Sequence, residues 1–252
     1  MTHYEIISKN TDSTVVAKYE SDGKRAKQYE SEAALERAFI EQLEKQAYEY
    51  ITIHSESEMV NNLRKQLEQL NNYQFADDEW KRFFAEIVAN PNEGIAEKSN
   101  RIQNDPIIPF KTNAGNTINI ALINKKHIHE NHLQVLNQYE EEGGSHATRY
   151  DVTILVNGLP LVHVELKRRG VNIREAFNQI NRYQRDSFWA GSALYEFVQL
   201  FVISNGTITK YYSNTTRFNH VREFGKMQRK NKSKTSNSFE FTSYWADAQN
   251  NT

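Results

Sequence analysis

The stretch that most restricts how this chain can fold is residues 151–167, in which two apolar runs flank the pair Asn157-Gly158. Both residues of such a pair tolerate positive φ, so Asn-Gly between strand-like runs is the strongest short-range signal for a β-hairpin. Because strand side chains alternate between the two faces of a sheet, the apolar residues at even positions should pack on a core. The polar and ionisable residues at odd positions should share the other face: Asp151, Thr153, His163, Glu165 and Lys167.

This parity restricts the turn. A plain two-residue Asn157-Gly158 loop would pair position 156 with 159 and 151 with 164, and so would put odd residues of one strand beside even residues of the other. We therefore predict a β-bulge or a loop of odd length. The loop would have three residues with Gly158 in the left-handed conformation, or five residues that include Pro160.

Two carboxylates and a lysine on one face suit a hard divalent cation. Mg²⁺ takes oxygen ligands, keeps several waters and is commonly held by one or two carboxylates together with a substrate phosphate. A cation held by Asp151 and Glu165 can activate an attacking water and neutralise charge on the phosphate, and Lys167 could orient that water. The alternative is an ordinary solvated polar face at a strand end, because short motifs often occur by chance.

The order of these residues resembles a known nuclease core. An Asp, an apolar strand, a turn, a second apolar strand and Glu-x-Lys form the pattern of PD-(D/E)xK nucleases, with Asp151, Glu165 and Lys167 at the motif positions. Tyr150 stands where the pattern often has Pro. The resemblance implies an α/β fold with a PD-(D/E)xK restriction-endonuclease-like core, in which a mixed central sheet is flanked by helices. It also implies that the backbone carbonyl of Leu166 helps to bind the metal.

The longer stretch over residues 149–170, continued by 174–183, is similar to the amino-terminal region of the restriction (motor and nuclease) subunit of type I restriction-modification enzymes. This similarity implies a Mg²⁺-dependent endonuclease domain that hydrolyses double-stranded DNA, with Mn²⁺ as a substitute metal. Subunits of that family continue into ATPase motor domains and associate with modification and specificity subunits. The present residues contain no nucleotide-binding motif, so ATP would serve only the motor domains.

A helix is expected before the hairpin. Ser31 can cap it, apolar residues recur every four positions after that, and a strand over residues 50–53 should follow. In the nucleases that the chain resembles, an acid on the first helix often adds an outer-sphere metal contact, and Glu36 is our choice for that role. Glu32 and Glu41 compete with Glu36, and a surface glutamate without a function is the alternative.

A second helix is expected over residues 173–186, after the hairpin. Gln179 and Tyr183 lie four residues apart and so share one face of this helix. A Gln-x-x-x-Tyr motif follows the catalytic hairpin in the similar restriction subunits. This implies that Gln179 and Tyr183 position DNA or support the site, with Arg182 available for a phosphate. An ordinary core edge is the alternative.

The remaining segments are predicted from periodicity. Residues 55–105 are expected to form a helical insertion, and residues 116–124 a strand. A second hairpin, with strands at 197–203 and 207–212, should extend the sheet. Residues 1–30 should form an irregular arm with one short strand.

A basic stretch at residues 219–238 is predicted to be a mobile loop, because it contains few apolar residues and one acid, Glu223. Its candidate contacts to the DNA backbone are Arg222, Arg229 and Lys230. A loop that only improves solubility is the alternative.

Composition narrows the class of protein. The 252 residues are enough for one endonuclease domain with a core of its own. With no cysteine, disulfides and cysteine-based metal sites are excluded, which fits a reducing cytosol. The resemblance to restriction subunits implies the cytoplasm of a prokaryote. The formal net charge of −1 creates no global field for nucleic acid, so any DNA contact must be local. No apolar run approaches the length of a membrane span, so no membrane partner is expected.

Two other functions remain open from the sequence. One is a DNA-binding or assembly module that kept the fold without hydrolysis and docks on a motor or methyltransferase partner. The other is a stand-alone repair or recombination nuclease.

Overall fold

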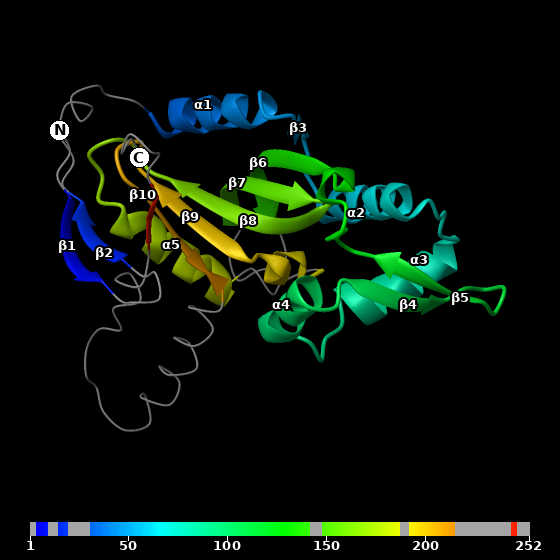
Figure 1. Cartoon of the computed structure of the whole chain (residues 1–252). Helices are drawn as coiled ribbons and strands as arrows, with labels where there is room; N and C mark the ends of the chain where they lie inside the picture. Colours follow the sequence, from blue (N-terminus) through cyan, green and yellow to red (C-terminus); the bar gives the residue numbers. More distant parts are fainter. Residues whose placement is uncertain are drawn as a thin grey trace.

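A seven-stranded mixed sheet forms the centre of the molecule (Figure 1). A computed structural model describes residues 4–9, 15–19, 31–141, 148–186, 192–214 and 243–245. The strand order is β11-β10-β9-β8-β7-β6-β3; β3 pairs parallel with β6 and β8 with β9, whereas the other neighbours are antiparallel. The strands are β3 (Glu49–Tyr50), β6 (Leu133–Glu141), β7 (Thr148–Val156), β8 (Leu159–Leu166), β9 (Leu200–Ser204), β10 (Thr209–Ser213) and β11 (Ser243–Trp245).

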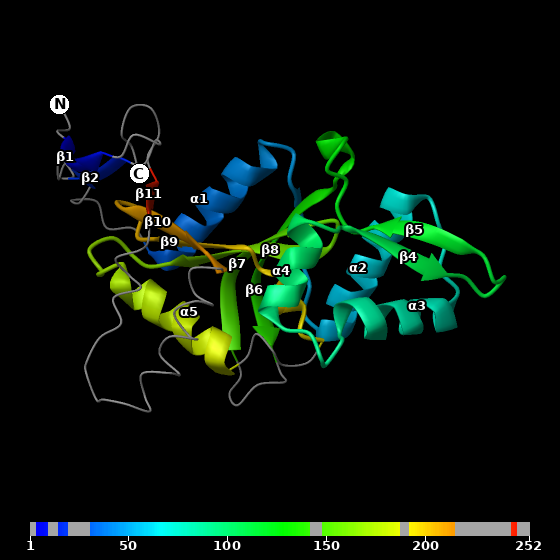
Figure 2. The same cartoon turned by 60° about the horizontal axis from the view of Figure 1, so that its bottom comes forward.

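Helices cover both faces of this sheet (Figure 2). Helix α1 (Glu32–Glu44) lies on one face, and α5 (Arg174–Asp186) with the short 3₁₀ helix η4 (Leu194–Phe197) lies on the other. The predicted α/β architecture, a mixed central sheet flanked by helices as in restriction endonucleases, is therefore confirmed.

The predicted hairpin consists of β7 and β8. A bulge in β8 brings the odd-numbered residues of the two strands onto the same face. Asn157 and Gly158 both have positive φ, 51° and 80°, and form a two-residue turn with Val156 opposite Leu159. The register then shifts, because Ile154 pairs with Val162 while Leu155 pairs with Pro160. Leu161 is the extra residue. The predicted bulge is confirmed, whereas the three-residue and five-residue loops are wrong.

Both faces of the hairpin are buried, which the sequence pattern did not indicate. The even residues Val152, Val164 and Leu166 pack with α1, as predicted. On the odd face Thr153 and His163 are also buried, and the Thr153 hydroxyl lies 3.0 Å from the Tyr195 hydroxyl of η4. The odd residues therefore belong to a second packed layer and not to a solvated face.

The insertion is mostly helical and ends in a small sheet. It comprises α2 (Glu56–Asn71), α3 (Asp77–Phe83), a π-helical turn η2 (Phe84–Val88) and α4 (Ile95–Gln103), followed by the hairpin of β4 (Ile107–Lys111) and β5 (Thr117–Ala121). Apolar stripes of these helices surround an aromatic cluster that includes Phe75, Trp80, Phe83 and Phe110.

This insertion holds the tip of the β7-β8 hairpin. Asn157 is buried, donates to the Leu122 carbonyl at 3.0 Å and to Asn131 at 2.8 Å, and accepts from the backbone N–H of His132 at 2.8 Å. Gly158 packs so closely on α2 that a Cβ there would lie 2.6 Å from Leu63 Cα. The turn is thus enclosed, although turns of this type usually face solvent.

Helix α4 joins the insertion to the second layer through a partly buried ion pair. Lys98 is fully buried, and its Nζ lies 2.7 Å from a carboxylate oxygen of Glu196 and 3.1 Å from the Ala193 carbonyl. The ammonium also lies 5.2 Å from the centroid of the Phe197 ring. Because Glu196 belongs to η4, the insertion contacts the element that covers the odd face of the hairpin.

Several predicted elements differ in extent. The strand expected over residues 50–53 is only Glu49–Tyr50, although the Ile51 N–H still donates to the Val135 carbonyl. β6 was not predicted, because its central residues Asn137 and Gln138 interrupt the apolar pattern. Instead of an irregular arm with one strand, residues 4–19 contain two paired strands, β1 (Tyr4–Lys9) and β2 (Val15–Tyr19).

Other predicted features are reproduced or fall outside the described residues. Ser31 caps α1, the helix after the hairpin is α5, and β9 and β10 extend the sheet as expected. The basic stretch at 219–238 lies outside the described residues. Within the described ranges no helix combines the length and the hydropathy of a membrane span.

We predict that Gly158→Ala lowers the free energy of unfolding by roughly 3 kcal/mol, because the new Cβ would adopt positive φ and collide with the α2 backbone. The matched control is Gly115→Ala, which has φ of 84° but no atom within 4 Å of its Cβ position, and should cost about 1 kcal/mol. Denaturant unfolding measures both. Equal losses in the two variants would contradict the close contact between hairpin tip and insertion.

Candidate active site

The hairpin opens at the end opposite its turn, and the predicted site residues gather there. Asp151 lies on β7, Glu165 near the end of β8 and Lys167 just after it. In the described sheet Asp151 has no Cα partner in β6 or in β8. Its Oδ2 instead accepts the backbone N–H of Leu166 at 2.9 Å. A side chain thus takes the place of a ladder hydrogen bond and holds the two strand ends at a fixed separation.

Lys167 turns back onto the strand that it follows. Its Nζ donates to Glu165 Oε1 at 3.0 Å and to the Leu166 carbonyl at 3.1 Å. Glu165 is fully buried and Lys167 is nearly so. The structure therefore brings together the four groups expected from the sequence: the Asp151 and Glu165 carboxyls, the Leu166 carbonyl and the Lys167 ammonium.

Burial controls the electrostatics of the carboxyl pair. Burial, with the nearby Glu165 charge as a second cause, raises the pKa of Asp151 to about 7. Burial also raises the pKa of Glu165 to about 7, against the opposing effect of Lys167. Ionisation of both adjacent carboxyls is therefore unfavourable unless a second positive charge, in addition to Lys167, lies close to them.

The oxygen atoms of Asp151, Glu165 and Leu166 suit a small, hard divalent cation that prefers oxygen ligands. Oε2 of Glu165 is buried and has no hydrogen-bond partner among the described residues. No group of three or more Asp, Glu, His or Cys side chains placed to hold a metal occurs in the described part of the chain. Two carboxylates and one backbone carbonyl would thus leave the remaining positions to water or a phosphate, which suits Mg²⁺ or Mn²⁺ and not a tetrahedral zinc site.

His163 is a site neighbour to which sequence reasoning gave no role. It is fully buried, and its Nε2 lies 3.5 Å from Glu165 Oε2. Burial lowers the pKa of His163 to about 4, so the ring is neutral at pH 7. Its ring packs edge-to-face on Tyr150 and Tyr183. The available signal was its odd position two residues before Glu165.

Gln179 and Tyr183 reach the same region from α5. The Gln179 side-chain amide donates to the Tyr183 hydroxyl, which in turn donates to the Arg149 carbonyl at 3.0 Å. Burial raises the pKa of Tyr183, and the Glu165 and Asp151 charges add to this effect. The Tyr183 hydroxyl therefore lies within electrostatic range of both carboxyls. Arg182 is exposed on the same helix.

The predicted outer-sphere acid is occupied elsewhere. Both carboxylate oxygens of Glu36 accept hydrogen bonds from side-chain amides of β6, those of Asn137 and Gln138. Glu32, the competing acid one turn earlier, accepts the backbone N–H of Arg168 at 3.3 Å, and its charge raises the pKa of Glu165. Glu32 is thus the α1 acid with a direct electrostatic effect on the site.

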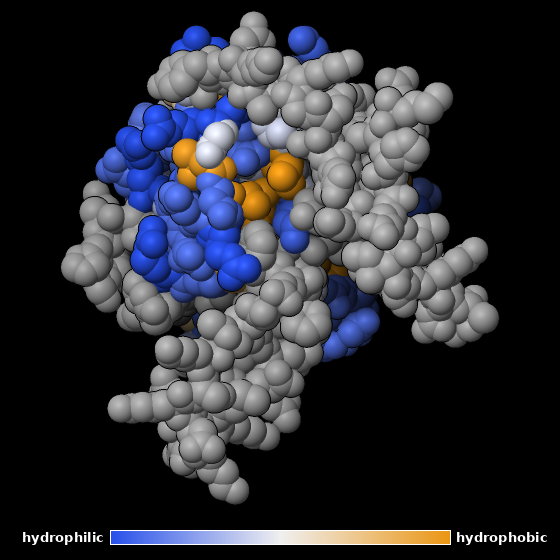
Figure 3. Space-filling view, turned by 90° about the vertical axis from the view of Figure 1, so that its left-hand side faces the viewer, coloured by the Kyte–Doolittle hydropathy of each residue, from blue (hydrophilic) through white to orange (hydrophobic). Residues whose placement is uncertain are grey.

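Three predicted DNA contacts, Arg222, Arg229 and Lys230, lie outside the described residues. The carboxyl end of β8 lies on the left of Figure 1, so Figure 3 faces the side on which the chain leaves this strand. The described surface there is mainly hydrophilic around a small apolar area.

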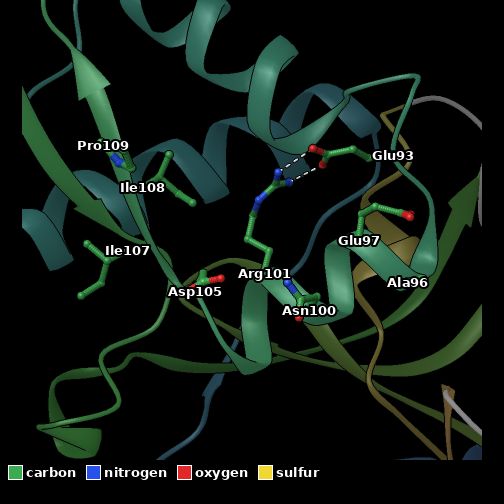
Figure 4. Close-up of a pocket in the computed structure, with 9 residues that line it drawn as sticks. All are labelled: Glu93, Ala96, Glu97, Asn100, Arg101, Asp105, Ile107, Ile108 and Pro109. Atoms are coloured by element: carbon green, nitrogen blue, oxygen red, sulfur yellow. Dashed lines mark hydrogen bonds and ion pairs between the residues drawn. The ribbon is translucent and has the colours of Figure 1, made fainter.

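A separate cleft lies between α4 and β4 and shares no residue with the carboxyl cluster (Figure 4). Its Arg101 forms two hydrogen bonds with Glu93, of 2.5 and 2.7 Å, and is therefore already neutralised. The cleft is lined by Glu93, Ala96, Glu97, Asn100, Arg101, Asp105, Ile107, Ile108 and Pro109. We assign no chemistry to it.

Comparisons with known proteins agree with one another. The family model described as "Type I restriction enzyme R protein N terminus" matches residues 29–220. The type I restriction enzyme EcoprrI endonuclease subunit of Escherichia coli is 44% identical over 97% of this chain and 73% of its own length.

Two staphylococcal proteins are also similar. The SsaAORF53P endonuclease subunit of Staphylococcus saprophyticus is 39% identical over 74% of this chain, and the SauCOLORF180P endonuclease subunit of Staphylococcus aureus is 37% identical over 88%. The chain spans 20% and 22% of the length of these two relatives. The similarity to them therefore concerns one part of much longer proteins.

We predict that Asp151→Asn stabilises the metal-free protein at pH 8 by roughly 2 kcal/mol. The pKa values of both carboxyls are raised in the folded state, so the folded protein binds protons more tightly than the unfolded chain between about pH 4 and pH 7. Stability should therefore fall as the pH rises through this window, and the asparagine variant escapes part of that fall.

Unfolding with a chelator present, from pH 4 to pH 8, measures this effect. The advantage of Asp151→Asn should disappear near pH 4. Asp105→Asn changes an exposed carboxylate outside the site and serves as the control. A constant difference between Asp151→Asn and the wild type at all pH values would show that ionisation of the buried carboxyls is not its cause.

Proposed function

Because the chain belongs to the family of type I restriction enzyme R protein N termini, we propose that it is the Mg²⁺-dependent endonuclease domain of such an enzyme. The reaction is hydrolysis of DNA phosphodiester bonds at a PD-(D/E)xK site formed by Asp151, Glu165 and Lys167. The observation that carries the proposal is the convergence of two buried carboxyls, a backbone carbonyl and a lysine at the open end of one hairpin.

The carboxyls act as ligands. Asp151 and Glu165, with the Leu166 carbonyl, would hold Mg²⁺, or Mn²⁺ in its place. When bound, such an ion supplies Lewis-acid charge at the scissile phosphate and lowers the pKa of a coordinated water. The raised pKa values of both carboxyls support this role, because a divalent cation would offset the cost of ionising them together. Glu165 Oε2, which has no hydrogen-bond partner among the described residues, is a further oxygen that could bind the ion.

Lys167 would contact the attacking water and the phosphate. The Lys167 ammonium would donate a hydrogen bond to the attacking water and offset negative charge on the phosphate as the ester oxygen departs. The neutral ring of His163 packs behind Glu165 and excludes water from that side. These residues would therefore keep the reacting groups in place.

The α5 residues position the DNA. Gln179 and Tyr183 tie α5 to the β7 backbone at Arg149, which fixes the helix relative to the carboxyls. Arg182 can contact a backbone phosphate from the exposed face of α5. Arg222, Arg229 and Lys230 are proposed as further phosphate contacts on the basis of their sequence alone.

The partners follow from the relatives. Since the similar proteins are named as subunits of type I restriction enzymes, we propose double-stranded DNA as substrate and modification and specificity subunits as partners. ATP would be needed only by motor domains in the longer protein. The proposed location is the cytoplasm of a prokaryote.

We predict that Asp151→Asn and Lys167→Met each lower DNA cleavage on the order of 100-fold or more, because each removes a group that acts on the reacting phosphate. Cleavage of plasmid DNA is measured in the presence of Mg²⁺. The variants are made in the full-length protein and are assayed in its complex with the partner subunits. Lys65→Met and Asp105→Asn change exposed charges outside the site and should cut normally. Unchanged cutting by either site variant, with contaminating nuclease excluded, would overturn the assignment.

Metal titration and the cofactor requirement distinguish the two alternative functions. A non-catalytic assembly module would bind DNA or partner subunits but need not bind Mn²⁺ through Asp151 and Glu165, which calorimetric titration tests. A stand-alone nuclease would cleave without ATP and without partner subunits.

We predict that Arg182→Ala weakens DNA binding and lowers the slope of log affinity against log salt concentration by about 1, as expected for one lost phosphate contact. Fluorescence anisotropy measures this in the Asp151→Asn background, where the DNA stays intact. Lys65→Ala removes an exposed positive charge from α2 and should leave the slope unchanged. The same slope in all three proteins would exclude Arg182 as a phosphate contact.

A further inference from the structure

The Lys167 ammonium rests on two oxygens that a metal would need. We propose that in the metal-free protein Lys167 acts as an internal cation, and that its Nζ must leave Glu165 Oε1 and the Leu166 carbonyl before a divalent cation can use them. This inference rests on the proposed function, because it takes these oxygens to be metal ligands. It adds that the lysine and the metal compete for them.

Burial explains why the lysine is held there. Glu165 is fully buried, so an unpaired carboxylate at this position would be costly. Lys167 supplies the charge and one hydrogen bond, and the Leu166 carbonyl receives another of its donors. Two charge-assisted contacts in a water-poor site hold the ammonium firmly.

Leu166 connects the two states. Its N–H holds Asp151 Oδ2, and its carbonyl holds Lys167. Asp151 is therefore already fixed beside Glu165, and the lysine is the group that the metal has to displace. The Glu165 oxygen that Lys167 does not contact, Oε2, is a ligand that a metal can take first.

Exchange orders the events at the site. While Nζ is bound to Glu165 and Leu166, two of its three donors are occupied, and it is poorly placed to assist a water. After exchange these donors are released. Lys167 thus becomes available to the water and the phosphate only once the metal is present. Without the metal, its contacts with Glu165 and Leu166 keep it from assisting the reaction.

The first test compares metal affinities of the whole chain. Mn²⁺ is titrated calorimetrically, without DNA, into the wild type and Lys167→Met at pH 8.5. Lys167→Met should bind Mn²⁺ at least tenfold more tightly, equivalent to about 1.4 kcal/mol, because no ammonium has to be displaced. Arg168→Met is the control: it removes the next positive charge, which is exposed, and should change the affinity by less than threefold.

The second test follows the lysine itself. Reductive methylation of Lys167 is measured by mass spectrometry with and without Mn²⁺, with exposed Lys65 as the internal reference. Lys167 should react slowly in the metal-free protein, where it is buried, and several-fold faster with Mn²⁺. This readout separates displacement from simple charge repulsion, which would raise the affinity of Lys167→Met without moving the lysine in the wild type.

The outcomes are distinct. Equal Mn²⁺ affinities of the wild type and Lys167→Met, or a labelling rate of Lys167 that Mn²⁺ leaves unchanged or lowers, would overturn the exchange while leaving the proposed nuclease intact. If neither protein binds Mn²⁺, the exchange and the metal-dependent function both fail. Tighter binding by Lys167→Met together with faster labelling supports the exchange.

Discussion

One extra residue determines which side chains of the hairpin share a face. Without Leu161, the Asn157-Gly158 turn would place Glu165 across the sheet from the neighbours that it needs, because a slip of one residue reverses every side chain of a strand. The bulge is stabilised where it forms. Pro160 lacks the N–H that a regular ladder would require, and the Leu161 carbonyl accepts the backbone N–H of Gln199 at 2.8 Å. The convergence of Asp151, Glu165 and Lys167 depends on this local correction.

Bringing two buried carboxyls together lowers the stability of the fold. The surrounding residues restrict how this destabilisation can be relieved. Carboxyls with pKa values raised to about 7 would normally protonate or turn outward. In this protein the Leu166 N–H holds Asp151, while Lys167 and the packed His163 ring enclose Glu165. A site kept charged in a poorly solvated position is less stable than a neutral one, and this is a common trade between activity and stability. These contacts therefore restrict local relaxation as a way to relieve the cost, which is consistent with the cation that we propose for this site.

The sequence predicted the site better than it predicted the layers around it. Alternation and an Asn-Gly pair are local signals, so the hairpin, the need for a bulge and the shared face of Asp151, Glu165 and Lys167 follow from the order of the residues alone. β6 does not, because Asn137 and Gln138 interrupt its pattern and hold Glu36 of a distant helix. The buried odd face was missed for the same reason. Thr153 and His163 look polar in sequence, and only the tertiary contact with Tyr195 of η4 and the surrounding rings makes them core residues.

The insertion belongs mechanically to the nuclease core, because it contacts the hairpin at two places. At the tip, Asn157 is bonded to the segments around Leu122 and Asn131, and Gly158 packs against α2. Along the odd face, Lys98 of α4 fixes η4, whose Tyr195 packs on the hairpin. An ion pair such as Lys98–Glu196 adds little net stability, but separating it would leave the buried Lys98 charge without its partner, which is strongly unfavourable. The insertion thus restrains the closed end of the hairpin and one of its walls, whereas the carboxyls and the lysine lie at the open end.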